Sequence, residues 1–433
     1  MRIRLMALVA VLISITLVSA NLLEKKVSAN KFSQTFPAVV CPPTGAGLNG
    51  QVSTGSRNTP SRKIVRNSSV FVPVKSSRFI IGADPVLLEG SAITSITWQS
   101  SASRWAGATV CKSPQGDEWF VGGSGDVTSK GRVLLVNSGL SNAIVDVALW
   151  SENGALAGKV FTVKPNSYTQ VRLDSLAVAQ SDLVVRVTPR SGRVSAYMID
   201  ERTKGLRSLG GDFVNSINTP RTDFVISGIP NQTINSKSVG HILRILSPGS
   251  AKATVSVDLI SNDGSFIPVG FDSREIAREI VTDLTLSPNI KTNVFSLHIH
   301  SDRPILASVY SEIMVSGHKD FLWNTATTQL TPMSLAVSGL EPTIVFTGDQ
   351  IRVGIESHLN NGRVKVTTVK GSDIASWKAP TGTRSIKITS VSSGVFGSGL
   401  VTSVNGIGTF PLMPGSLLSR VAIPSSNISV INR

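Results

Sequence analysis

The sequence predicts an all-β protein made of tandem immunoglobulin-like β-sandwich modules that follow an N-terminal signal or anchor segment. Charged residues make up only 16% of the 433 residues and aromatic residues 6%, while Ser, Thr, Val and Gly abound, a composition typical of β-rich exported proteins. Short runs of alternating apolar and polar residues are separated by turn residues. One such stretch recurs at an offset of 110 residues, and the chain is long enough for about three domains.

The first 20 residues predict export across a membrane. Two arginines precede an uncharged apolar run from Leu5 to Leu17, and small residues stand at the first and third positions before Asn21. This pattern indicates a signal peptide over residues 1–20. The alternative is an uncleaved signal anchor, because the apolar stretch extends to Leu23 and approaches the length that spans a bilayer. In either case we expect an extracytoplasmic protein, secreted or anchored to the cytoplasmic membrane by its N-terminus.

A basic stretch follows, and we expect it to begin as a polar linker over residues 21–36. Between Lys25 and Arg78 the sequence has nine Lys and Arg residues and no Asp or Glu. Such a stretch favours anionic partners, namely envelope polymers or lipid headgroups. The alternative is a solvated linker whose charge only aids solubility. Nucleic acid is not an expected partner, because the stretch lacks interleaved aromatic residues.

The two cysteines, Cys41 and Cys111, predict one structural disulfide. An even number of cysteines in a chain bound for an oxidising compartment usually forms disulfides. A catalytic or metal-ligating thiol would need a histidine or a further cysteine at short spacing, and the sequence has neither. We therefore expect the disulfide to tie an N-terminal β region over residues 37–112.

An internal repeat predicts the size of the modules. Arg132 to Gly154 parallels Ile242 to Gly264, with alternating apolar residues and a glycine at matched positions. Alternation places every second side chain of a strand on the same face, toward one core. The residues before each final glycine are typical of hairpin turns. A hairpin-rich antiparallel sheet is therefore expected in each copy.

Further segments extend the repeat along the chain. Leu183 to Asp200 parallels Phe295 to Glu312 at a similar offset, and Ile351 to Gly371 again alternates around an Asn-Gly turn. The size and the frequency of turns are those of a β-sandwich. The expected repeats cover residues 113–205, 222–318 and, in a more divergent form, 319–433.

No residue pattern predicts a catalytic, cofactor or metal site, so the protein is not expected to be an enzyme. His298 and His300 would lie on one face of a strand, but a metal site needs a third ligand, and only Asp302 is near in sequence. The glycine cluster from Gly122 to Gly125 lacks the lysine and the helix of a phosphate-binding loop. No nucleophile elbow is present either.

Asp117, Glu118 and Trp119 are the best candidates for contact with a ligand. An aromatic face packs against sugar rings, and neighbouring carboxylates accept hydroxyl protons. These residues support an alternative function as a carbohydrate-binding or carbohydrate-active protein. Against it, a tryptophan at the start of a strand more often belongs to the core.

The stretch from Cys111 to Gly123, CKSPQGDEWFVGG, resembles domain of unknown function 5719, an actinobacterial family of secreted or membrane-anchored proteins. Cys41 and Pro42 are similar to the early Cys and Pro of that family, whereas Glu118 stands where a second tryptophan is expected. The resemblance implies an exported envelope protein and assigns no catalytic residues. We therefore expect a non-enzymatic scaffold or binding module for anionic wall or membrane components or for other envelope proteins.

Overall fold

The computed structural model describes residues 32–422 except 66, 67, 69, 103, 235, 236 and 239, so the predicted signal or anchor segment lies outside the described residues. The chain divides into two compact units. The described part of the smaller unit is an antiparallel pair, β1 (Phe32–Thr35) with β35 (Ser419–Ala422). The larger unit covers residues 37–417. Among the described residues, no helix is long and apolar enough to span a bilayer.

The larger unit consists of strands and one four-residue helix, α2 (Leu173–Leu176), among its described residues, which confirms the all-β fold class. Its strands form four modules, named here the first (37–112), second (113–220), third (221–330) and fourth (331–417). The first module contains β2 (Val39–Cys41), β3 (Asn49–Ser53), β4 (Thr59–Lys63), β5 (Val72–Val74), β6 (Arg78–Ile81), β7 (Val86–Leu88), β8 (Ile93–Thr94), β9 (Ile96–Ser100) and β10 (Ala106–Val110).

The other three modules have longer strands. The second contains β11 (Glu118–Val121), β12 (Arg132–Asn137), β13 (Ala143–Ser151), β14 (Gly154–Val163), β15 (Ser167–Arg172), β16 (Leu183–Ser191), β17 (Val194–Lys204) and β18 (Arg207–Val214). The third contains β19 (Arg221–Pro230), β20 (Thr233–Ile234), β21 (Lys237–Ser238), β22 (His241–Leu246), β23 (Ala253–Ser261), β24 (Gly264–Phe266), β25 (Arg274–Ile276), β26 (Thr282–Leu286), β27 (Val294–Val315) and β28 (His318–Thr325). The fourth contains β29 (Met333–Ala336), β30 (Thr343–Leu359), β31 (Val364–Lys378), β32 (Thr383–Val391), β33 (Phe396–Ser403) and β34 (Gly406–Pro411).

All four modules share one strand order. In the second module, one sheet has the order β11-β16-β13-β14 and the other the order β15-β12-β17-β18. The first module repeats this arrangement as β2-β7-β4-β5 and β6-β3-β9-β10. In the third and fourth modules single long strands replace pairs of shorter ones: β27 pairs with β19 and β23 through its first half and with β22 and β28 through its second. The immunoglobulin-like strand order is not confirmed, because an immunoglobulin sheet joins its first strand to its second.

The alternation seen in the sequence places side chains between the two sheets of a module. Val145 and Val147 of β13 are buried against Val133 and Leu135 of β12, which lies in the facing sheet. β12 has no alternation, and its other face is buried as well: Leu134 packs with Val40 and Leu87 of the first module. A continuous apolar run therefore marks a strand that is covered on both faces.

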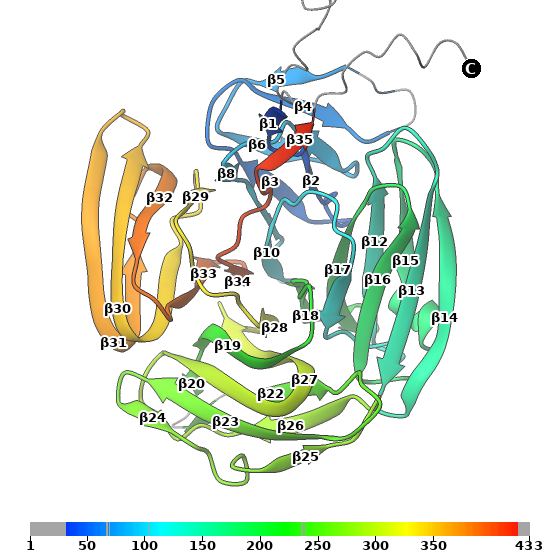
Figure 1. Cartoon of the computed structure of the whole chain (residues 1–433), viewed down its shortest axis with the longest axis vertical. Coiled ribbons are helices and arrows are strands. Elements are labelled where there is room, and N and C mark those ends of the chain that lie inside the picture. The colour runs from blue at the N-terminus through cyan, green and yellow to red at the C-terminus, as the bar shows by residue number, and fades with distance from the viewer. Residues whose placement is uncertain are drawn as a thin grey trace, which may run out of the picture. The chain divides into compact units, whose positions relative to one another are not determined.

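The last strands of the four modules meet at the centre of the larger unit, where Figure 1 shows β10, β18, β28 and β34 close together. Asp320 of β28 accepts hydrogen bonds from the Gly211 N–H at 3.0 Å and the Ala106 N–H at 3.3 Å. Asn215, next to β18, donates to the Thr409 carbonyl of β34 at 3.2 Å. Every module is thus tied to the others through buried polar contacts.

The predicted disulfide between Cys41 and Cys111 is confirmed. It lies beside the backbone bridge between Val40 and Lys112, which joins the first strand of the module to the residues after its last strand. Trp119 and Ile217 make the corresponding bridge in the second module without a disulfide. The strands of the first module are only two to five residues long, and a small core gains most from a covalent crosslink.

Candidate functional site

The structure places the three residues predicted to contact a ligand at the junction of the first and second modules. Glu118 is buried and forms an ion pair with Lys112; its carboxylate also accepts hydrogen bonds from the Ser216 hydroxyl and the Ala196 N–H, both at 3.0 Å. Both carboxylate oxygens are therefore engaged by protein groups.

Asp117 and Trp119 are engaged in the same way. Asp117 accepts two hydrogen bonds from Arg186, at 2.8 and 2.9 Å, and one from Thr188 at 3.1 Å. Trp119 is only 4% exposed, stacks on Trp150 at 5.1 Å and carries the Arg186 guanidinium over its ring at 4.8 Å. These contacts hold the sheet surface together and leave no open aromatic face.

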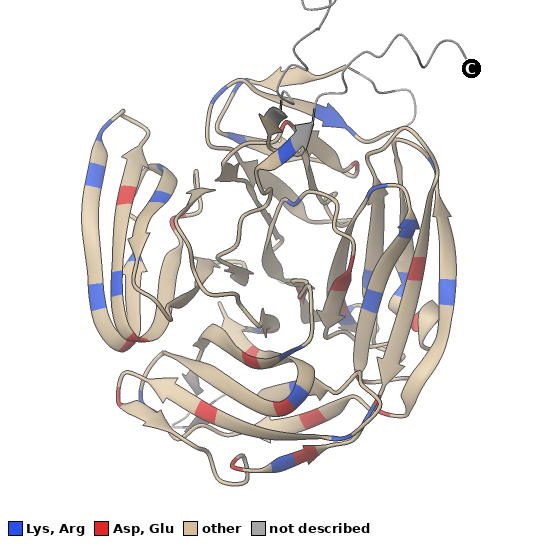
Figure 2. Ribbon diagram, in the orientation of Figure 1, with Lys and Arg blue, Asp and Glu red and all other residues tan. Residues whose placement is uncertain are grey.

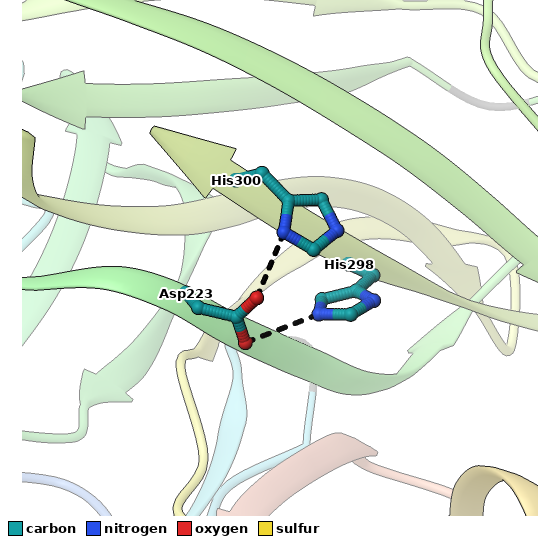
Figure 3. Close-up of side chains that lie close together, drawn as sticks. All are labelled: Asp223, His298 and His300. Atoms are coloured by element: carbon teal, nitrogen blue, oxygen red, sulfur yellow. Dashed lines mark hydrogen bonds and ion pairs between the residues drawn. The ribbon is translucent and has the colours of Figure 1, made fainter. Parts of the chain in front are cut away.

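A second cluster, formed by Asp223, His298 and His300, is the only group of its kind in the described part of the chain whose donor atoms could share a metal ion. Figure 3 shows both imidazole rings turned toward the carboxylate. Asp223 lies on β19 and the histidines lie on the adjacent β27, with His300 directly opposite Asp223 in the register. The side chains between them, Phe224 and Ile299, are buried, so the three polar residues share the outer face of the sheet.

The distances within this cluster are short. His298 Nε2 lies 3.2 Å from Asp223 Oδ1, and His300 Nδ1 lies 2.8 Å from Asp223 Oδ2. The two ring centroids are 4.0 Å apart. Asp258, on β23 at the other side of β27, has Oδ2 at 3.6 Å from His300 Nε2.

Sequence reasoning found the two histidines but missed Asp223. The expected neighbour, Asp302, instead accepts a hydrogen bond from the Thr254 N–H at 2.7 Å. Asp223 is 75 residues before His298, and only strand pairing brings them together. Its position could have been found by extending the repeat upstream, because Asp223 is the counterpart of Asp117: each lies two residues before the bridge residue of its module, Val225 or Trp119.

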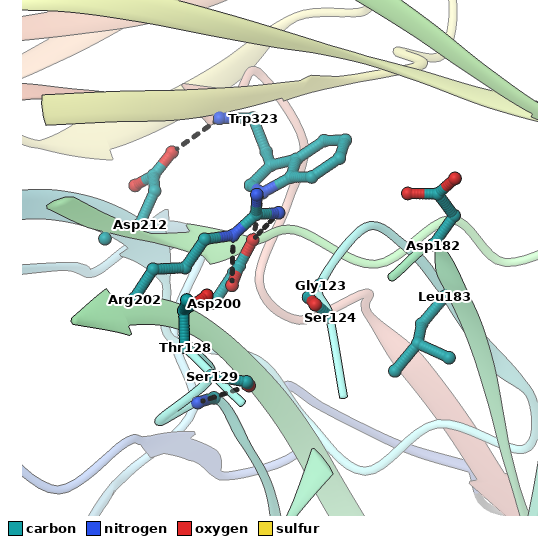
Figure 4. Close-up of polar contacts among 12 residues, drawn as sticks. Gly123, Ser124, Thr128, Ser129, Asp182, Leu183, Asp200, Arg202, Asp212 and Trp323 are labelled. Atoms are coloured by element: carbon teal, nitrogen blue, oxygen red, sulfur yellow. Dashed lines mark hydrogen bonds and ion pairs between the residues drawn. The ribbon is translucent and has the colours of Figure 1, made fainter. Parts of the chain in front are cut away.

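Buried charges around the last strands of the modules form a separate polar centre (Figure 4). Asp200 binds the Arg202 guanidinium at 2.9 Å and accepts a hydrogen bond from Trp323 Nε1 at 3.1 Å, while the Trp323 N–H donates to Asp212 at 2.9 Å. Burial raises the pKa of Asp212 well above its usual range, and burial raises the pKa of Asp320 to about 8. Asp200, Asp212, Asp320 and Trp323 are buried, so these groups serve the packing of the modules.

A cavity of about 640 Å³ lies between the third and fourth modules. Its lining combines apolar residues such as Leu400 and Ile407 with uncharged polar residues such as Asn231 and Gln232. No Lys, Arg, Asp or Glu belongs to this lining. Charged ligands are therefore poorly matched to it.

The basic stretch from Lys25 to Arg78 is only partly a linker, since its described residues include β3, β4 and β5 of the first module. Arg57 and Lys75 are exposed and form no ion pair among the described residues. They lie at the same end of the β4–β5 pair, where the Asn58 N–H donates to the Val74 carbonyl at 2.6 Å. Lys63, in contrast, faces Asp84 at 3.7 Å.

Comparison with known proteins supports the resemblance found in the sequence. A model of a family of unknown function (DUF5719) matches residues 76–389. Comparison with the curated proteins gives no match. Among solved structures, Thermotoga maritima 1070 is 14% identical with a TM-score of 0.21, covering 25% of this chain and 93% of that one. A tetra-tandem repeat from the extending region of a large adhesion protein is 11% identical with a TM-score of 0.12, covering 90% of this chain and 100% of that one.

Proposed function

This chain belongs to the family of unknown function DUF5719, and we propose that it is a non-enzymatic, exported cell-envelope protein whose first module binds anionic envelope components. The ligand chemistry is a surface of phosphate or carboxylate groups, carried by wall polymers or by lipid headgroups. The other modules form a fixed scaffold around the contact. The proposal applies to the protein outside the cytoplasm, either released or anchored by its N-terminus.

The uneven distribution of charge carries this proposal. The first module has eight Lys and Arg residues against two Asp and Glu, whereas the second has eleven against ten and the third nine against ten. Figure 2 shows the same contrast along the ribbon. Two of the eight cations, Arg104 and Lys112, are paired with Glu201 and Glu118 of the second module. Exposed cations such as Arg57 and Lys75, which form no ion pair with any described residue, remain for an anionic surface, where each is worth about 1 kcal/mol.

Export is supported by the signal-like N-terminal sequence and by the buried disulfide, since disulfides persist in oxidising compartments. The non-enzymatic assignment is supported by the engaged carboxylates of Asp117 and Glu118. The carbohydrate alternative has no comparable support, because Asp117, Glu118 and Trp119 do not line the cavity between the third and fourth modules.

Binding of the purified protein to isolated wall sacculi and to vesicles containing anionic lipid tests the proposal. Binding should weaken steeply between 50 and 300 mM salt, roughly as the Debye length shortens. The double variant R57Q/K75Q should lose about tenfold or more in affinity. Preference for sacculi or for vesicles identifies which source supplies the anionic groups.

A matched control removes two cations that are already paired. R190Q/K252Q lowers the net charge by the same amount, but Arg190 and Lys252 face Asp146 and Glu275. Its affinity should stay close to that of the wild type. Affinity that does not change with salt concentration, or an equal loss of affinity in both double variants, would show that the first module is not the contact surface.

A further inference from the structure

We propose that Asp223, His298 and His300 form a binding site for a divalent first-row transition metal ion on the outer face of the third module. This site is independent of the anionic contact proposed for the first module. Its ligand set, two imidazoles and one carboxylate, is one that zinc and ferrous iron use in proteins.

The spacing of the donor atoms supports a shared ion. One donor atom from each of the three residues can be chosen so that all lie within 4.8 Å of one another. Two ligands on a tetrahedral ion with bonds of about 2.0–2.1 Å are roughly 3.3 Å apart. The carboxylate-to-imidazole distances of 3.2 and 2.8 Å, one to each oxygen of Asp223, are close to that value.

In the second module, the position equivalent to Asp223 is held by Asp117, which forms an ion pair. There, Asp117 is neutralised by the guanidinium of Arg186, a permanent cation directly beside it. In the third module the counterparts of Arg186 and Thr188 are His298 and His300, as the strand registers show. Among the described residues, no Lys or Arg forms an ion pair with Asp223, and its carboxylate faces the two imidazoles instead. A divalent ion bound here is coordinated by the carboxylate and by both imidazoles.

The site is also held in place and open on one side. Three paired strands, β19, β27 and β23, fix the backbone under it, and a site on regular strands is more rigid than one on loops. Asp258 lies near the second nitrogen of His300, where a carboxylate orients a ligating ring. The side chains of Asp223, His298 and His300 are 57%, 32% and 43% exposed, so solvent can supply the remaining ligands.

Equilibrium dialysis of the chelator-treated protein against Zn²⁺ tests the site. We expect about one equivalent bound per chain, with affinity falling on acidification because bound protons compete for the imidazoles. H298Q, H300Q and D223N should each weaken binding at least tenfold. The control H358Q removes a partly exposed histidine that lies beside another carboxylate, Glu356 at 3.7 Å, and should bind like the wild type.

A second measurement needs no variant. Paramagnetic Co²⁺, added to the wild-type protein in one equivalent, should broaden the imidazole proton resonances of His298 and His300 and spare those of the other histidines. The absence of saturable Zn²⁺ binding, unchanged binding in H298Q and H300Q, or broadening spread over all histidines would each overturn the proposal and leave a carboxylate that is hydrogen-bonded to two imidazoles.

Discussion

Asp117 and Asp223 occupy the same position in two successive modules, two residues before the bridge that closes each module, yet they meet different partners. Asp117 faces the guanidinium of Arg186, whereas Asp223 faces the imidazoles of His298 and His300. The shared position shows that the same place on the sheet can carry either an Asp–Arg ion pair or a carboxylate flanked by two imidazoles. The partners differ because Arg186 and Thr188 on β16 are replaced by His298 and His300 on β27.

The first prediction concerns the ion pair in the second module. R186Q should lower the free energy of unfolding by about 1 kcal/mol, because it removes a partly exposed ion pair and the cation–π contact with Trp119. Urea denaturation measures this change. R190Q serves as the control, since Arg190 pairs with Asp146 on the same sheet and is more exposed; its unfolding midpoint should not move. Equal effects in the two variants would contradict the role given to Arg186.

The second prediction concerns the disulfide. Replacing Cys41 and Cys111 by alanine should destabilise the first module by about 2–4 kcal/mol, the typical contribution of such a crosslink. Hydrogen exchange should show the largest loss of protection at the Val40 and Lys112 amides. Each of these N–H groups donates a hydrogen bond to the carbonyl of the other residue, beside the disulfide. Amides of the third module provide the internal control. A loss spread evenly over all modules would contradict a local effect.

The third prediction concerns stability in acid. Burial lowers the pKa of His241 to about 4, whereas the unfolded chain binds this proton near pH 6.5. Between these values the unfolded state holds more protons, so stability falls as the pH drops from 6.5 to 4. In H241Q this part of the decline, up to about 1.4 kcal/mol per pH unit, should disappear.

Urea unfolding at several pH values between 4 and 7 measures this slope. H358Q is the matched control, because His358 is partly exposed on the fourth module, and its profile should follow that of the wild type. A wild-type slope in H241Q would show that His241 is not responsible.

The fourth prediction has the opposite sign. Burial raises the pKa of Asp320 to about 8, whereas the unfolded side chain releases its proton near pH 3.9. The folded state therefore holds the extra proton between pH 4 and 8, and stability falls as the pH rises through this range. D320N should flatten the profile between pH 5 and 8, at the cost of the weak hydrogen bond from the Ala106 N–H.

The same unfolding series, extended to pH 8.5, measures the effect of D320N. D349N is the control, because Asp349 is exposed at the register shift in the middle of the β30–β31 pairing. Parallel profiles for D320N and the wild type would contradict a protonated Asp320 in the folded protein.

Local sequence patterns predicted which faces of the strands are buried. The alternation of Val145, Val147 and Leu149 placed these side chains in the core, and the structure buries all three. The even cysteine count predicted the pairing of Cys41 with Cys111. Both inferences depend on local geometry or on simple counting: side chains alternate across a strand, and two cysteines have only one possible pairing.

The sequence did not reveal that residues 37–112 form a fourth copy of the module. Strands such as β2 and β7 have only three residues each, too few to show a period of two. Their equivalence with β11 and β16 appears only in the order of the sheets. Strand order depends on which segments pair, and alternation carries no information about pairing partners.

The sequence by itself therefore determined the all-β class, the disulfide, the buried faces of the longer strands and the basic character of the first module. The tertiary structure decided which distant side chains meet. It joined the Glu118 carboxylate to the Ser216 hydroxyl and the Ala196 N–H, and it brought Asp223 to histidines more than 70 residues away. The physical reason is that a residue's own strand sets the direction of its side chain, whereas its chemistry depends on neighbouring strands that are selected by packing of the whole module.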